Sequence, residues 1–122
     1  MTALQVILPW PPRALSPNSR THWRKLASVK ATYRRACWAL TREAAGADYA
    51  RPLSGMVNVS LEFVPPDRRA RDIDNCIAAM KSGLDGLADA LQLDDRRFRL
   101  LVQMAEPGSV GGFVRVAVCS CA

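Results

Sequence analysis

The sequence has little histidine and no closely spaced C-x-x-C cysteine pair. His22 is the only histidine among its 122 residues. Structural zinc sites are built mainly from histidine and cysteine ligands, so a zinc site is poorly supported. We expect the cysteines to be reduced thiols, mostly in the core. They are Cys37, Cys76, Cys119 and Cys121.

Long apolar runs are also missing. The N-terminal stretch MTALQVILPW lacks a basic leading region, is too short to span a bilayer, and runs into PWPP. We therefore expect neither a signal peptide nor a membrane helix, but a cytoplasmic protein without a membrane partner. The chain has no internal repeat and no low-complexity tract. Its length suits one domain, residues 1–122, with a single core.

Acidic residues are outnumbered by basic ones. Seventeen Lys and Arg against eleven Asp and Glu give a net charge of +6. Such a balance favours polyanionic partners, although it says nothing about the fold. Nucleic acid is therefore the leading partner class.

The first half of the chain predicts two strands around one long helix. A strand over residues 3–8 must end at PWPP, because proline has no N–H for a sheet. The polar stretch 13–21 is a predicted loop. Apolar residues recur at helical spacing from Trp23 to about Ala45, and the outer face is basic. That face is either a solvated surface or a DNA-binding one. Apolar and polar side chains alternate over residues 57–63, which predicts a half-buried strand.

The second half predicts one long helix and two strands. The helix follows an apolar stripe from Ile73 to Leu91, at steps of four and three residues. Strands over residues 98–106 and 113–119 follow it, joined by the turn-rich PGSVGG. The predicted fold is an α/β (α+β) domain of two layers with the order β-α-β-α-β-β. Its mixed sheet has about four strands, beside two main helices.

The stretch RRARDIDN, residues 68–75, carries both signs of charge in front of the second helix. Arg68, Arg69 and Arg71 would attract phosphate, whereas Asp72 and Asp74 would repel it unless they held a cation. The two aspartates could instead be a helix cap and a first-turn acid. A second acidic pair, Asp94 and Asp95, follows the helix and could be a solvated turn.

Helix length decides whether the two acidic pairs can share a metal ion. A straight helix of about 19 residues would separate them by roughly 28 Å, which is too far. A common site requires the chain after Leu91 to run back along the helix. Alternatively, the helix must stop near Gly83 or Gly86, where glycine weakens it.

Three motifs in order resemble the RusA-like Holliday-junction resolvases of bacteria and prophages. The first is ILPWPP followed by Asn18, similar to the family pattern LPWPPS.N. The second is PPDRRARDIDN, similar to PDRRxRDxDN, and the third is LDD at residues 93–95. The resemblance covers nearly the whole chain.

This resemblance implies a homodimeric, magnesium-dependent endonuclease that cuts four-way DNA junctions symmetrically in recombination and repair. It implies metal-binding catalytic roles for Asp72, Asp74 and Asp95, with Asp94 beside them, and DNA contacts for the loop arginines and Asn18. Magnesium prefers oxygen ligands and keeps several waters, so aspartates suffice without histidine. Mn²⁺ is the alternative ion.

The chain departs from the family at one position. Relatives carry a lysine one helical turn after the second aspartate, where this sequence has Ala78. The nearest lysine is Lys81, seven residues after Asp74 and about 10 Å further along the axis. Lys81 either reaches back along that face as a catalytic cation or only pairs with Asp85 as an i,i+4 partner.

Two other functions are compatible with the sequence. One is a DNA-binding phage or prophage protein without catalysis, although such a protein gains nothing from acids beside its arginines. The other is a metal-dependent nuclease acting on other branched or single-stranded nucleic acid. No base-stacking surface is evident, and Trp10, Trp23 and Trp38 are expected to serve the core or an interface.

Overall fold

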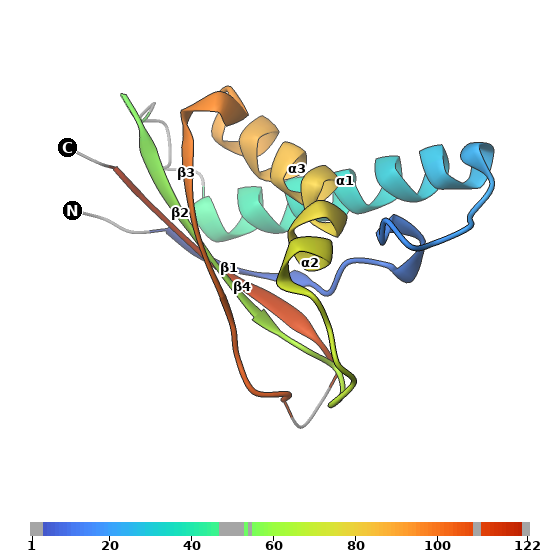
Figure 1. Ribbon diagram of the computed structural model, residues 1–122. Coiled ribbons are helices and arrows are strands. Elements are labelled where there is room, and N and C mark those ends of the chain that lie inside the picture. Colours follow the sequence, from blue (N-terminus) through green and yellow to red (C-terminus); the bar gives the residue numbers. More distant parts are fainter. Residues whose placement is uncertain (1–3, 47–52, 54, 109–110, 121–122) are drawn as a thin grey trace.

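A computed structural model describes residues 4–46, 53, 55–108 and 111–120. In this part of the chain, three α-helices cover one face of a four-stranded sheet (Figure 1). The α+β class and the predicted order of elements are confirmed, except that the second helix is divided. The strands are β1 (Leu4–Pro9), β2 (Val57–Val64), β3 (Phe98–Met104) and β4 (Phe113–Ser120). The helices are α1 (Trp23–Ala45), α2 (Ile73–Ala79) and α3 (Lys81–Leu91), with 3-10 turns η1 (Arg13–Leu15) and η2 (Asp95–Arg97).

The sheet is mixed, in the order β1-β4-β2-β3. β4 pairs antiparallel with both β1 and β2, whereas β3 pairs parallel with β2 at the sheet edge. Strands β3 and β4 are therefore not neighbours, although they follow each other in the chain. A parallel pair needs a long crossover, which α2 and α3 supply between β2 and β3.

The core lies between the sheet and the helices. Alternate residues of β2, from Val57 to Phe63, are fully buried, and β1 and β4 show the same alternation. Tyr33 of α1 is buried on these strands and donates a hydrogen bond of 2.6 Å to the carbonyl of Pro9. This bond ties α1 to the end of β1, where the loop toward Asn18 begins.

Glycines let α3 lie directly against α1. A Cβ on Gly86 would collide with the carbonyl oxygen of Arg34 and lie 3.0 Å from the backbone nitrogen of Trp38. A Cβ on Gly83 would lie 2.8 Å from the Tyr33 ring. The prediction that the helix could stop at these glycines is wrong, because α3 continues through both of them and packs on α1 there.

The second helix is interrupted at Met80 instead. Met80 has φ −85° and ψ −5°, and its N–H is shared by the carbonyls of Cys76 and Ile77 at 3.1 Å each. The apolar stripe continues across the break, since Met80 is fully buried and Leu84 lies one turn further. The prediction of one continuous helix is therefore wrong, and the periodic pattern did not reveal the break because Met80 stays in the right-handed helical region.

The described cysteines are free thiols, as predicted. Cys37 and Cys76 are buried and Cys119 is partly buried, whereas Cys121 lies outside the described residues. No helix in the described ranges is long and apolar enough to cross a membrane.

Candidate functional site

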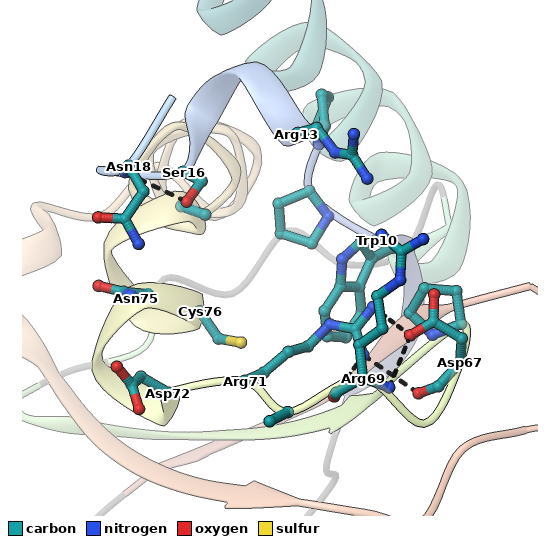
Figure 2. Close-up of a pocket in the computed structure, with 15 residues that line it drawn as sticks. Trp10, Arg13, Ser16, Asn18, Asp67, Arg69, Arg71, Asp72, Asn75 and Cys76 are labelled. Carbon is teal, nitrogen blue, oxygen red and sulfur yellow. Dashed lines mark hydrogen bonds and ion pairs between the residues drawn. The ribbon is translucent and has the colours of Figure 1, made fainter. Parts of the chain in front are cut away.

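A cleft of about 550 Å³ lies beside the start of α2. We call it the main cleft. It is lined by the segment after β1, from Trp10 to Asn18, and by the loop between β2 and α2, from Pro66 to Asp72. Figure 2 shows Asn18, Asn75 and Asp72 along one side, with Trp10, Arg13 and Arg69 along the other. Two of the three sequence motifs therefore border one cavity.

Arg71 holds the loop in shape. Its guanidinium pairs with Asp67 at 2.9 Å and donates to the carbonyls of Asp67 and Arg69 at 3.1 Å each. It also lies 5.4 Å from the centre of the Trp10 ring. The backbone N–H of Arg69, and then Arg71, lower the pKa of Asp67 below its usual value. Arg71, predicted to contact DNA, thus uses most of its hydrogen-bonding capacity within the protein.

The other two loop arginines, Arg68 and Arg69, differ in whether they line the main cleft. Arg69 lines the main cleft, and its side chain has no carboxylate partner among the described residues. Arg68 does not line the main cleft; it borders a neighbouring groove of about 260 Å³ beside Met104 and Glu106, which Arg69 and Arg71 also line. Of these two arginines, only Arg69 lines the main cleft together with Asp72.

The aspartates of RRARDIDN are free. Asp72 occupies the N-cap position of α2, yet its side chain makes no capping hydrogen bond, and it lines the main cleft. Asp74 is exposed in the first turn, and no described residue forms an ion pair with it. The capping interpretation of Asp72 is therefore wrong, and its carboxylate is available to a ligand.

The two aspartates of the second acidic pair, Asp94 and Asp95, contact different basic residues. Asp94 caps η2 by accepting from the Arg96 N–H at 2.9 Å and pairs with the Arg96 guanidinium at 2.8 Å. These contacts, the side-chain bond first, lower the pKa of Asp94 to about 2. Asp94 thus fits the solvated-turn interpretation. Asp95 instead reaches Lys81, with 2.5 Å between its Oδ2 and the lysine Nζ.

Lys81 bridges two carboxylates. Its ammonium lies 3.0 Å from Asp85 Oδ1 and 2.5 Å from Asp95 Oδ2. The hydrogen bonds to Asp95, and then to Asp85, raise the pKa of Lys81. The predicted pairing with Asp85 is confirmed, whereas a contact between Lys81 and Asp74 is not observed. Asp95 reaches Lys81 because the chain turns at Gln92, which is left-handed with φ 57°, and runs back along α3.

Three neighbouring hollows have lining residues in common, and we call them the joined hollows. The main cleft shares Ser16 and Ala79 with a groove of about 420 Å³, which we call the side groove, between the loop 14–21, α1 and α3. The side groove shares Ala78 and Lys81 with a hollow of about 480 Å³ that Asp95 lines. Ala78, where the resembling family carries lysine, therefore lies between the two acidic regions.

The predicted four-aspartate cluster is not assembled. Within the described residues, no three His, Cys, Asp or Glu side chains lie close enough together to hold a metal ion. Asp72 and Asp95 instead border different parts of the joined hollows. The donors themselves suit magnesium, which binds proteins through one or two carboxylates and keeps several waters.

Two residues of the site were not predicted from the sequence. Arg13 and Asn75 line the main cleft, although neither was a candidate site residue. One signal was present in the charge pattern: residues 1–42 contain eight basic residues and no acidic one. Residues 43–122 contain nine basic and eleven acidic residues, so the whole excess of positive charge belongs to the first third of the chain.

The chain is similar in sequence to a known bacterial protein. An uncharacterized protein of Xylella fastidiosa strain Temecula1 is 40% identical over 91 residues, which are 75% of this chain and 60% of that relative. The chain thus spans less than two thirds of the relative's length. No protein-family model matches the chain.

Proposed function

We propose that the protein is a magnesium-dependent endonuclease that resolves four-way DNA junctions in recombination and repair. The observation that carries the proposal is the main cleft, in which the N-terminal motif and the RRARDIDN loop form facing walls. The choice of a junction as substrate rests on the sequence resemblance to RusA-like resolvases.

The walls of the main cleft suit a phosphodiester. Arg13 and Arg69 are cations without described carboxylate partners, so they can bind phosphate oxygens without first breaking an ion pair. Asn18 and Asn75 carry side-chain amides that can donate to the same group or orient a water molecule. Arg71 positions Arg69 by fixing the loop backbone.

A cation would complete this site. Asp72 and Asp74, at the start of α2, are the residues that would hold Mg²⁺ or Mn²⁺, whereas Asp95 borders a different hollow and is paired with Lys81. When bound, such an ion neutralises phosphoryl charge and lowers the pKa of a water ligand. Lys81 keeps an ammonium beside Asp95, so positive charge remains near the position of the missing family lysine.

A homodimer would match the symmetry of a four-way junction. A junction has two equivalent strands to cut, and a twofold dimer offers one site to each. The edge strand β3 supports dimerisation because Leu100, Leu101 and Met104 are 40%, 60% and 36% exposed. An unpaired strand edge with apolar side chains favours association with another chain.

Single-turnover cleavage of a synthetic four-way junction tests the proposal through matched variants. Asp72→Asn should abolish cutting with Mg²⁺ present, because the amide is a poorer ligand than the carboxylate. Arg69→Ala should lower the cutting rate about 10- to 1000-fold, the range of a lost phosphate-stabilising donor. Arg68→Ala, on the neighbouring residue outside the main cleft, should lower it far less. Equal effects of the two arginine variants would contradict the assignment of the cleft.

The two other functions give different results in the same assay. A non-catalytic DNA-binding protein would bind the junction and leave it intact with either metal ion. A nuclease for other nucleic acids would cut flaps or single strands faster than the junction. Either result would replace junction resolution as the function.

A further inference from the structure

Trp23 is exposed at the beginning of α1. Its 66% exposure is the highest of any large apolar side chain described, whereas Trp10 packs edge-on against Phe63 at 5.8 Å. Of the two roles predicted for the tryptophans, the core or an interface, Trp10 takes the core role and Trp23 does not. Water contact with an indole is unfavourable, so this ring adds little to the stability of the fold. A ligand that covers it would gain the burial that the fold leaves unused.

Two neighbours hold the indole without covering it. The ring of His22 stacks at 5.6 Å and 28° from it, and the guanidinium of Arg24 lies 5.2 Å from its centre. His22 is itself fixed, because its Nδ1 accepts a hydrogen bond of 3.2 Å from the Arg24 N–H. We call His22, Trp23 and Arg24 the aromatic platform. A planar partner can extend a stack that is already in place.

The surroundings of the aromatic platform are strongly basic. It lies within the first 42 residues, which carry no acidic side chain. Arg20 and Lys25 flank it, both exposed and without an ion pair among the described residues. Arg34, further along α1, is already paired with Asp89 at 2.6 Å. The platform therefore suits a planar group that belongs to a polyanion.

The aromatic platform is adjacent in sequence to residues that line the side groove. It starts α1 at the end of the helix that projects away from the sheet (Figure 1). Thr21 and Leu26, on either side of Trp23 in sequence, line the side groove, which meets the main cleft at Ser16. Trp23 itself does not line the side groove, so the platform is a surface next to that groove in sequence and separate from its walls.

We propose that the aromatic platform binds an unpaired nucleobase of a DNA strand, with Arg20 and Lys25 binding the adjoining phosphates. Every base has a π-face, so stacking on an indole is tolerant of sequence and needs an unpaired base. The inference rests on the proposed function in taking DNA as the ligand. It adds that the protein distinguishes an opened strand from a closed duplex.

Equilibrium binding to a fluorescein-labelled oligodeoxythymidylate, in low salt with EDTA, tests the inference. Fluorescence anisotropy should show Trp23→Ala binding roughly 5- to 150-fold more weakly, the range of one lost base–aromatic stack. Trp38→Ala removes the other exposed tryptophan of α1 and should bind as the parent does. All three proteins should bind a blunt duplex equally, because its bases are already stacked. Lys25→Ala should weaken both complexes and reduce their salt dependence.

Tryptophan emission gives a second readout. Oligodeoxythymidylate should quench the emission of the parent and of Trp38→Phe. Trp23→Phe should retain most of the affinity and lose most of the quenching, because phenylalanine still stacks. Unchanged single-strand affinity in Trp23→Ala, or equal losses for single strand and duplex, would overturn the inference. Since no metal ion or cleavage is involved, platform binding in a protein that cuts no junction would refute only the proposed function.

Discussion

Removing the ammonium of Lys81 tests whether Asp95 is held beside α3 in solution. Lys81→Met keeps the aliphatic stem and the helix propensity, so the change is almost purely electrostatic. It breaks two ion pairs, at 3.0 Å to Asp85 and 2.5 Å to Asp95, and leaves both carboxylates without this partner.

The expected loss of stability is modest. The Lys81 side chain is 63% exposed, so each pair is screened by solvent and contributes about 0.2–1 kcal/mol. Together they predict a decrease of roughly 0.5–2 kcal/mol in the free energy of unfolding at neutral pH and low salt. The decrease should shrink in 1 M salt, where the screening length is about 3 Å.

The pH dependence has a definite direction. Hydrogen bonds to Asp95 and Asp85 raise the pKa of Lys81 in the folded state. The stabilising contribution is therefore fully present below the ordinary lysine pKa, about 10.4. It is lost as the pH rises through the raised folded-state pKa. The parent and Lys81→Met should converge in stability above that pH.

Urea unfolding, followed by tryptophan fluorescence, measures these differences. Lys25→Met is the control, because Lys25 is an exposed helical lysine without an ion pair among the described residues. A double-mutant cycle with Asp95→Asn should give a coupling of about 0.2–1 kcal/mol at low salt. A coupling of zero, or one that 1 M salt leaves unchanged, would refute the ion pair as the reason that Asp95 lies beside Lys81.

Four further predictions concern the site and the fold. Asp74→Asn should abolish junction cleavage and leave binding equal or tighter, as measured by gel shift; cutting at the parent rate would contradict its metal role. Ala78→Lys should partly restore the cutting rate of Lys81→Ala, because it returns an ammonium to the same hollow; no rescue would assign phosphate stabilisation to an arginine. Gly86→Ala should lower the unfolding free energy by roughly 1–3 kcal/mol in urea, whereas Gly108→Ala, whose Cβ meets nothing nearer than 3.4 Å, is the control. Light scattering should give twice the chain mass of 13.4 kDa; a monomer mass alone would count against the dimer.

The fold was largely predictable because its signals are local. Alternation along β2 and the apolar stripe of α1 record which face of each element is buried, and both elements form where expected. The break at Met80 leaves that stripe in phase, so periodicity could not reveal it. The separation of β3 from β4 depends on which strand pairs with β2, a long-range choice that no local pattern records.

The candidate site was predictable in its motifs and not in its contacts. The spacing of Asp72 and Arg69 placed both at one loop, and both line the main cleft. Which arginine remains free depends on packing across about 60 residues of sequence, since Arg71 is held over Trp10. The contact between Lys81 and Asp95 likewise requires the left-handed turn after α3.

Incubation of the protein with a synthetic four-way junction and a matched linear duplex, with and without Mg²⁺, is the most direct test of junction resolution. We expect paired, symmetric nicks in the junction only, and only with the metal ion present. An intact junction under conditions in which the protein binds it, or equal cutting of the linear duplex, would contradict junction resolution.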